Sequence, residues 1–171
     1  DNDPVMFLEN TLLYGEEWEV PDNDELPGGE LVIPLGVADI KREGNDLTLV
    51  CHGRAVLTCL KAADILQSEH GISAEVVDIR TIRPLDWMTI LESVKKTNRL
   101  VIVEEQWPFA SVSSEITYRI QKEGFDYLDA PIRRITAADA PLHYAPNLVA
   151  AALPDVPRTV RLVKEVMYQV K

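Results

Sequence analysis

The sequence predicts an α/β fold, in which a mostly parallel sheet lies between helices on both faces to give three layers. Apolar runs of four or five residues alternate with longer segments that carry apolar residues at helical spacing. This alternation is typical of βαβ units, whose crossover connections are right-handed. The chain has 171 residues, of which 46% are hydrophobic, enough for one domain with its own core.

The expected sheet begins with the apolar run Leu47–Cys51. A helix should follow it and end at Gly71, with one apolar stripe formed by Val56, Leu60, Ala63 and Leu66. The next strand is Glu75–Ile79, and Arg80–Leu85 forms a loop. Asp86 is placed to cap a second helix, which buries Ile90, Leu91 and Val94.

Two further strands complete the alternating pattern, at Leu100–Val103 and Ile132–Ile135. Ser111 can cap the helix between them, which runs to Gly124 with Val112, Ile116 and Ile120 facing inward. Asp155 can cap a last helix with a strong apolar stripe, formed by Val160, Val163, Val166, Met167 and Val170.

The leading segment has a different composition. Val5–Leu8 would suit a buried strand, whereas Glu16–Glu30 is acidic and rich in proline and glycine, which punctuate loops. Leu31–Ile40 is expected to form a further strand that pairs at an edge of the sheet, in antiparallel orientation.

Charge is distributed unevenly along the chain. Residues 1–40 hold eleven Asp and Glu and no Lys or Arg, while residues 41–171 hold seventeen of each sign, so the net charge is −11. This balance excludes nucleic-acid binding, which needs a basic surface. The acidic segment could attract a basic partner or simply be solvated. No apolar run approaches the length of a membrane span.

Cysteine and histidine offer little chemistry. Cys51 and Cys59 are predicted to be reduced, buried thiols, because a disulfide framework needs more cysteines in a shorter chain. His52, His70 and His143 do not cluster at ligand spacing, so no metal site is expected.

Two groups of residues at strand ends are candidates for a site. His52-Gly53-Arg54 follows a strand and opens a helix, where backbone N–H groups and Arg54 could hold a small anion. A structural turn or a subunit contact is the other interpretation. Glu104 and Glu105 end the third strand, where they could serve acid–base chemistry or a structural or interface role.

Two other features have mainly local interpretations. Ser111, Ser113 and Ser114 lack the Gly-x-Ser-x-Gly pattern of a hydrolase, so helix capping accounts for them better. Asp129 precedes Ala130-Pro131, so it is either a turn residue or an exposed anion for a partner's Arg or Lys.

These motifs together resemble the C-terminal domain of the transketolase superfamily. The resemblance is carried by VCHGRAV, DIRTIRPLDWMTI, VIVEEQWPFA, YLDAPIRRITAADAPLHYA and the final helix. Within the superfamily, DIRTIRPLD and the LDAP–ADAP–YA spacing are most similar to the pyruvate dehydrogenase β subunits. The resemblance implies a five-stranded mixed sheet. It also implies that residues 1–30 are the end of a preceding pyrimidine-binding domain with an acidic linker, and that residues 31–171 are the transketolase C-terminal-like domain.

The resemblance further implies a role in assembly. Family members form α2β2 heterotetramers with an α subunit and a second β subunit. They bind thiamine diphosphate and Mg²⁺ between the α subunit and the preceding domain, so this chain is expected to hold no catalytic or cofactor-binding residue. Other possibilities are the same domain of a branched-chain 2-oxo acid dehydrogenase or a transketolase-like enzyme, and a small-anion-binding enzyme that uses His52, Glu104 and Glu105.

A docking role is also implied by the resemblance. In the family, this domain receives the peripheral subunit-binding domain of dihydrolipoyl acyltransferase, which meets an acidic residue at the position of Asp129 and the terminal carboxylate, here on Lys171. The family usually ends in an apolar residue, so the Lys171 cation beside that carboxylate is a departure. The expected location is the mitochondrial matrix, or the cytoplasm of a bacterium.

Overall fold

The computed structural model describes residues 3–6, 8–19 and 32–169. The chain forms two units, Asp1–Pro34 and Leu35–Lys171. In the first unit, a short 3-10 turn (η1, Thr11–Leu13) is capped by Asn10, whose side chain accepts a hydrogen bond from the backbone N–H of Leu12.

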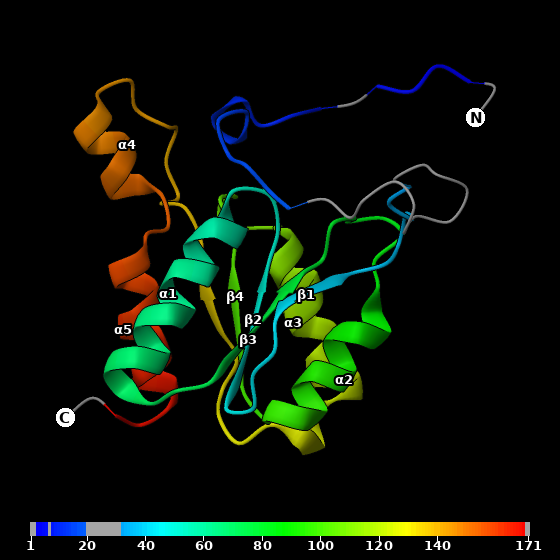
Figure 1. Ribbon diagram of the computed structural model, residues 1–171, viewed down its shortest axis with the longest axis vertical. Coiled ribbons are helices and arrows are strands. Elements are labelled where there is room, and N and C mark those ends of the chain that lie inside the picture. Colours follow the sequence, from blue (N-terminus) through cyan, green and yellow to red (C-terminus); the bar gives the residue numbers. More distant parts are fainter. Residues whose placement is uncertain (1–2, 7, 20–31, 170–171) are drawn as a thin grey trace. The chain divides into compact units, whose positions relative to one another are not determined.

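The second unit contains the alternating strands and helices that the sequence predicts (Figure 1). Its elements, in chain order, are β1 (Asp39–Arg42), β2 (Leu47–Cys51), α1 (Ala55–His70), β3 (Ala74–Asp78), α2 (Trp87–Thr97), β4 (Leu100–Val103), α3 (Val112–Glu123), η4 (Phe125–Tyr127), β5 (Arg133–Ile135), α4 (Pro146–Ala152) and α5 (Val156–Val166). The strands form one five-stranded sheet in the order β1-β3-β2-β4-β5.

The sheet is mostly parallel, with one antiparallel edge strand. β2 pairs in parallel with β3 and β4, and β4 pairs in parallel with β5. β1 pairs antiparallel with β3, which confirms the predicted orientation of the edge strand. The predicted strand is wrong over residues 32–38, because β1 begins only at Asp39, and Leu31 lies outside the described residues. Pro34 lacks a backbone donor and Gly36 adopts φ +76°, and both disrupt an extended ladder.

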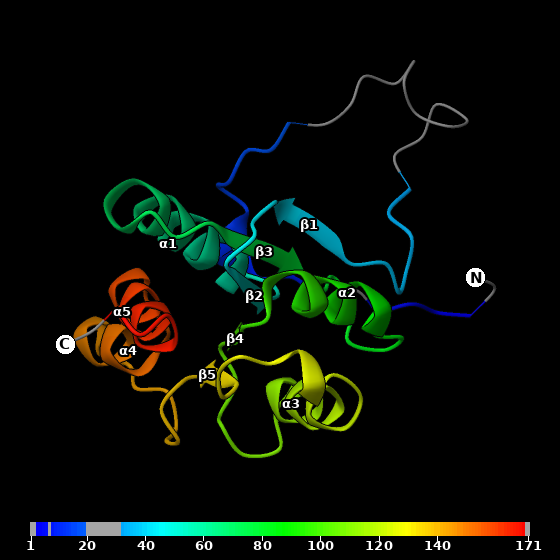
Figure 2. The ribbon, with the colours of Figure 1, turned by 90° about the horizontal axis from the view of Figure 1, so that it is seen from below.

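Helices cover both faces of the sheet, giving three layers. Figure 2 shows α1 and α5 on one side and α2 and α3 on the other. Side chains alternate accordingly along β2: Leu49 and Cys51 belong to the cluster under α1 and α5, whereas Val50 belongs to the cluster under α2 and α3. Because β2 is buried on both faces, nearly all of its residues are apolar.

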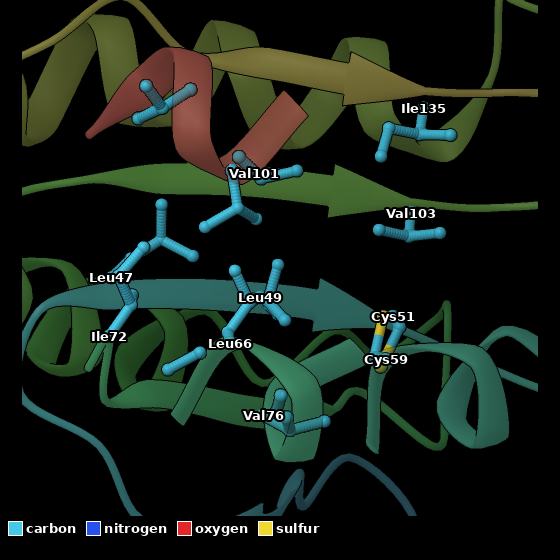
Figure 3. Close-up of a cluster of buried hydrophobic side chains, with 14 of the residues drawn as sticks. Leu47, Leu49, Cys51, Cys59, Leu66, Ile72, Val76, Val101, Val103 and Ile135 are labelled. Atoms are coloured by element: carbon cyan, nitrogen blue, oxygen red, sulfur yellow. The ribbon is translucent and has the colours of Figure 1, made fainter. Parts of the chain in front are cut away.

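Figure 3 shows the cluster under α1, where Leu49, Leu66 and Val101 lie close together. Cys51 and Cys59 are buried in the same cluster as free thiols, as predicted. A hydrogen bond with Cys59 and burial raise the pKa of the Cys51 thiol well above its ordinary value. Both cysteines therefore act as small apolar core residues.

Local signals in the sequence identify most helix ends correctly. Asp86 accepts a hydrogen bond from the backbone N–H of Thr89, and Asp155 accepts one from Arg158. Gly71 ends α1 in the left-handed conformation, with φ +66°. Helix α4, which has only seven residues and begins with Pro146, was not predicted from the sequence.

The strand predicted at Val5–Leu8 is wrong for its described residues, which have no strand conformation. An apolar run needs a neighbouring strand to satisfy its backbone hydrogen bonds, and no described strand of this unit supplies one. Phe7, most of the predicted acidic linker, and Val170 of the predicted last stripe lie outside the described residues.

Within the described residues, no helix has the length and apolar composition needed to cross a membrane.

Gly44, in the turn between β1 and β2, gives a test of this packing. A Cβ atom at this position would lie 2.2 Å from the backbone nitrogen of Glu75, so the first residues of β3 would have to move. We expect Gly44→Ala to lower the free energy of unfolding by about 2–3 kcal/mol, as overpacking does elsewhere. Urea unfolding measures this change. Gly15→Ala is the control, because nothing lies within 4 Å of its added Cβ. Equal stability of the two variants would contradict the packing described here.

Candidate functional site at the carboxyl end of the sheet

The predicted strand-end residues lie where the strand order reverses. The chain passes from β2 to β3 on one side of β2 and then returns to form β4 on its other side. Cys51 at the end of β2 is paired in register with Val103 at the end of β4, so the loops that follow them start side by side. Ligands in open α/β sheets bind at such a reversal point.

The structure brings His52 and Glu104 together across this point. Nε2 of His52 lies 3.9 Å from Oε2 of Glu104, which has no exposed surface. Nε2 of His52 is itself buried, and it has no hydrogen-bond partner within the described part of the chain. Glu104 is therefore the acidic group that this imidazole nitrogen faces.

Glu104 also caps helix α3 from outside the helix. Its carboxylate accepts hydrogen bonds from the backbone N–H of Ser113, at 3.2 Å, and from the Ser113 hydroxyl. The N-cap position of Ser111 was predicted correctly, but its side chain makes no capping hydrogen bond. A carboxylate accepts more strongly than a hydroxyl and suits the positive end of the helix dipole, so Glu104 takes this role.

The surroundings of Glu104 favour its charged form. Burial alone would raise the pKa of this carboxyl group. Polar contacts with His52, Ser111 and Ser113 outweigh burial and lower the pKa below its ordinary value. The carboxylate is therefore ionised at neutral pH, which suits a structural acceptor better than a general acid.

Arg54 and Glu105 form a second pair between the same two loops. Nε of Arg54 lies 3.3 Å from Oε1 of Glu105, and both side chains are about one-third exposed or less. Gly53 between His52 and Arg54 has φ +56°, a conformation that favours glycine. Because Arg54 already faces a carboxylate, its charge is partly compensated, which weakens the case for a small-anion site.

Sequence reasoning missed Arg134, which supports this end of the sheet from β5. Its guanidinium donates to the hydroxyl of Ser114 at 2.7 Å, to that of Ser113 at 3.3 Å, and to the carbonyl of Pro108 at 3.1 Å. It thereby ties the loop after β4 to the start of α3. The signal in the sequence was the pair Arg133-Arg134 within a short strand, because two adjacent arginine side chains need polar partners.

The loop after β4, which these polar contacts hold in place, carries exposed aromatic side chains. Trp107 is 53% exposed and Phe109 is 86% exposed. A shallow hollow of about 410 Å³ adjoins them, lined by Glu105, Gln106, Trp107, Phe109, Ala110 and Ser111. Exposed aromatic groups of this size are typical of surfaces that meet another protein.

Asp129 lies at the opposite end of the sheet. Its backbone N–H donates to the carbonyl of Asn98, just before β4 begins, at 2.8 Å. Its carboxylate is 61% exposed and lies 3.8 Å from the guanidinium of Arg99, a partner that the sequence analysis did not anticipate. Lys171, the other predicted docking residue, lies outside the described residues.

No group of three or more His, Cys, Asp or Glu side chains within the described residues could hold a metal ion. The residues His52, Arg54, Glu104 and Glu105 do come together, and the carboxylate of Glu104 is held by the backbone N–H and the hydroxyl of Ser113. These polar contacts therefore hold the loops after β2 and β4 in place. We refer to this set of contacts as the polar frame.

Comparison with protein families gives one match across most of the chain. Residues 36–158 match the family model described as transketolase, C-terminal domain. The chain belongs to the transketolase C-terminal domain family. The match covers every strand of the sheet and all the predicted site residues except Lys171.

Curated relatives of this transketolase C-terminal domain include β subunits of pyruvate dehydrogenase. The "Pyruvate dehydrogenase E1 component subunit beta" of Rhizobium meliloti (strain 1021) is 49% identical over 169 residues, 99% of this chain. The mitochondrial subunit beta of Saccharomyces cerevisiae (strain ATCC 204508 / S288c) is 48% identical over 168 residues, 98% of this chain. The chain spans 35% of the length of the Rhizobium protein and 45% of the yeast protein.

A solved structure supports the fold of the domain. The protein described as "Split gene transketolase, inactive beta4 tetramer" matches with a TM-score of 0.70 and 23% identity. The match covers 82% of this chain and 45% of that one. It supports the three-layer arrangement with a five-stranded mixed sheet.

Glu104→Gln tests the role of the buried carboxylate in this domain. We expect the free energy of unfolding at pH 7 to fall by about 1–2 kcal/mol, since a charged acceptor becomes neutral. Because the folded-state pKa is lowered, the carboxylate stabilises the fold above the unfolded-state pKa, and this contribution is lost as pH falls through the folded-state pKa. The difference between wild type and variant should therefore shrink in acid.

Urea unfolding at several pH values measures this difference. Glu105→Gln is the matched control, because it removes a partly exposed ion pair, for which we expect less than about 0.5 kcal/mol. If Glu104→Gln is as stable as Glu105→Gln at pH 7, Glu104 does not have the capping role described.

Proposed function

We propose that the chain is the C-terminal domain of the β subunit of a pyruvate dehydrogenase, in which it serves assembly and docking. The observation that carries this proposal is identity of 48–49% over nearly the whole chain to such subunits from bacteria and mitochondria. Similarity at this level extends through all the elements of the domain. The same domain of a branched-chain 2-oxo acid dehydrogenase or a transketolase-like enzyme is the nearest alternative.

The whole enzyme would decarboxylate pyruvate oxidatively and transfer the acetyl group to lipoyl groups, with thiamine diphosphate and Mg²⁺. The described residues do not gather the carboxylates that would hold Mg²⁺. Arg54, a natural partner for a diphosphate, faces Glu105 instead. We therefore assign neither group to residues of this chain, and we infer that the chain is inactive by itself.

The same relatives support a proposal for the compartment. Subunits from rice and yeast are described as mitochondrial, while Rhizobium and Rickettsia are bacteria. We propose the mitochondrial matrix, or the cytoplasm if the source is bacterial. Two buried, reduced thiols are compatible with either compartment.

We propose that the carboxyl end of the sheet contacts a second β subunit. Large apolar side chains project from the loops after β4 and β5, including Phe109 at 86% and Leu142 at 58% exposure. The backbone N–H of Ala137 donates to the carbonyl of Gln106, which joins these loops into one surface. The net charge of residues 41–171 does not oppose pairing of two copies of this part of the chain, because it holds equal numbers of acidic and basic residues.

Phe109→Ser tests this contact. We expect the wild-type chain to self-associate. The dissociation constant of the variant should be about tenfold higher, because a large exposed ring is lost from the contact. Sedimentation velocity over a range of concentrations measures the change. Tyr118→Ser on α3 removes a ring of 63% exposure away from this surface and should leave self-association intact. Identical sedimentation of all three chains would contradict the proposed contact.

We propose that Asp129 receives the peripheral subunit-binding domain of dihydrolipoyl acyltransferase. The support is physical: the carboxylate is 61% exposed, and its distance to Arg99 is 3.8 Å, longer than a direct hydrogen bond. An exposed ion pair of this kind is worth about 0–1 kcal/mol, so a partner's arginine can replace Arg99 at small cost. A charge-assisted bond to a partner's Arg or Lys would then fix the docking register.

Asp129→Ala should weaken docking about tenfold to a hundredfold, since a charge-assisted hydrogen bond contributes about 1.5–3 kcal/mol. Isothermal titration of the chain with the peripheral subunit-binding domain measures the dissociation constant. Asp64→Ala is the control, because Asp64 on α1 is 71% exposed and pairs with Arg42. If the wild-type chain binds and Asp129→Ala binds equally well, the role assigned to Asp129 fails.

A further inference from the structure

Two aromatic rings stand immediately before Asp129 in the chain. The short η4 turn carries Phe125, which is 59% exposed, and Tyr127, which is 41% exposed. Leu128, between the turn and Asp129, packs instead against the core cluster under α2 and α3. Exposed aromatic groups of this kind are typical of surfaces that contact another protein.

Hydrogen bonds hold the rings and the carboxylate on one frame. The side-chain amide of Asn98 donates to the carbonyl of Tyr127 at 2.9 Å, and the carbonyl of Asn98 accepts from the backbone N–H of Asp129 at 2.8 Å. The N–H of Leu128 donates to the carbonyl of Phe125 at 3.0 Å. Because the turn is already ordered, a partner would lose little free energy in ordering it.

The chemistry of the turn suits a cation. Nζ of Lys95 lies 5.4 Å from the centre of the Tyr127 ring, which shows that this ring face accommodates an ammonium group. Lys95 itself is paired with Glu92 at 2.8 Å. Asp126 lies between the two rings in the sequence, and in the described part of the chain no basic side chain forms an ion pair with it.

A hollow beside the turn gives room for a side chain of a partner. Its volume is about 380 Å³, and it is lined by Gln121, Lys122, Glu123, Phe125, Asp126 and Tyr127. Two of the lining residues are acidic and one, Lys122, is basic. Glu123 accepts a hydrogen bond from the indole N–H of Trp87, and Asp126 is the other carboxylate in the lining.

We propose that Phe125, Asp126 and Tyr127 form an aromatic–acidic edge that extends the docking contact of Asp129 and recognises a second Arg or Lys of the same basic partner. The partner's cation stacks on the exposed rings and pairs with Asp126, while another cation of that partner meets Asp129. This inference rests on the proposed docking role of Asp129. It adds residues that select a partner by the spacing of its cations, which a single carboxylate does not do.

Titration with the peripheral subunit-binding domain of dihydrolipoyl acyltransferase tests the edge in the full 171-residue chain. We expect Phe125→Leu and Tyr127→Leu each to weaken binding about threefold to tenfold, because leucine keeps an apolar side chain but removes the ring face. Asp126→Asn should weaken binding similarly and reduce its salt dependence. Tyr127→Phe should bind like wild type, because the ring face is retained.

Tyr118→Leu is the matched control, because this tyrosine on α3 is 63% exposed but lies outside the turn and the lining of its hollow. Thermal unfolding of every variant shows whether the fold is retained. If Asp129→Ala weakens binding while Phe125→Leu, Tyr127→Leu and Asp126→Asn stay within twofold of wild type, the edge is refuted and the docking role of Asp129 stands. If the wild-type chain does not bind the domain, both proposals fail.

Discussion

The carboxylate of Glu104 is the contact on which the carboxyl end of the sheet depends. It follows the interior strand β4, has no exposed surface, and accepts two hydrogen bonds from Ser113 at the start of α3. Arg134 on β5 contacts the same serine, and His52 after β2 faces the same carboxylate. The neighbouring strands β2, β4 and β5 and the helix α3 are therefore connected through contacts around one buried carboxylate. Removal of one member would leave polar groups unpaired, which costs more than the net worth of any one bond.

This polar frame holds a surface in place at the carboxyl end of the sheet. The position is the one where open α/β sheets bind ligands. Here, however, the polar groups of the two loops face one another, since Arg54 lies beside Glu105 and His52 lies beside Glu104. The side chains that remain exposed are aromatic, such as Trp107 and Phe109. A fixed base with exposed rings has the properties of a protein interface, in which rigid apolar groups contribute most of the binding energy.

The sequence predicted those features that depend on short-range rules. Leu47–Cys51 identified a strand buried on both faces, and Asp86 and Asp155 identified helix starts, because each signal lies within a few residues of its effect. The capping role of Glu104 could not be predicted in this way. Its partner lies nine residues later, after a loop whose path depends on the Arg134 contacts. The strand prediction at Val5–Leu8 failed because apolar character favours a strand only where a neighbouring strand can pair with it, and the local sequence does not show whether one exists.

The two ends of the sheet differ in how readily a partner can use their charges. A buried carboxylate such as Glu104 is held by several bonds, and its separation from them would cost several kcal/mol, so no docking partner can recruit it. The pair between Arg99 and Asp129 is exposed and longer than a hydrogen bond, so exchange of one guanidinium for another is nearly neutral. For the docking that we propose at that end, affinity would come from contacts that the unbound domain lacks. The rings of Phe125 and Tyr127 are exposed and already ordered by Asn98, so they meet that requirement with little loss of conformational freedom.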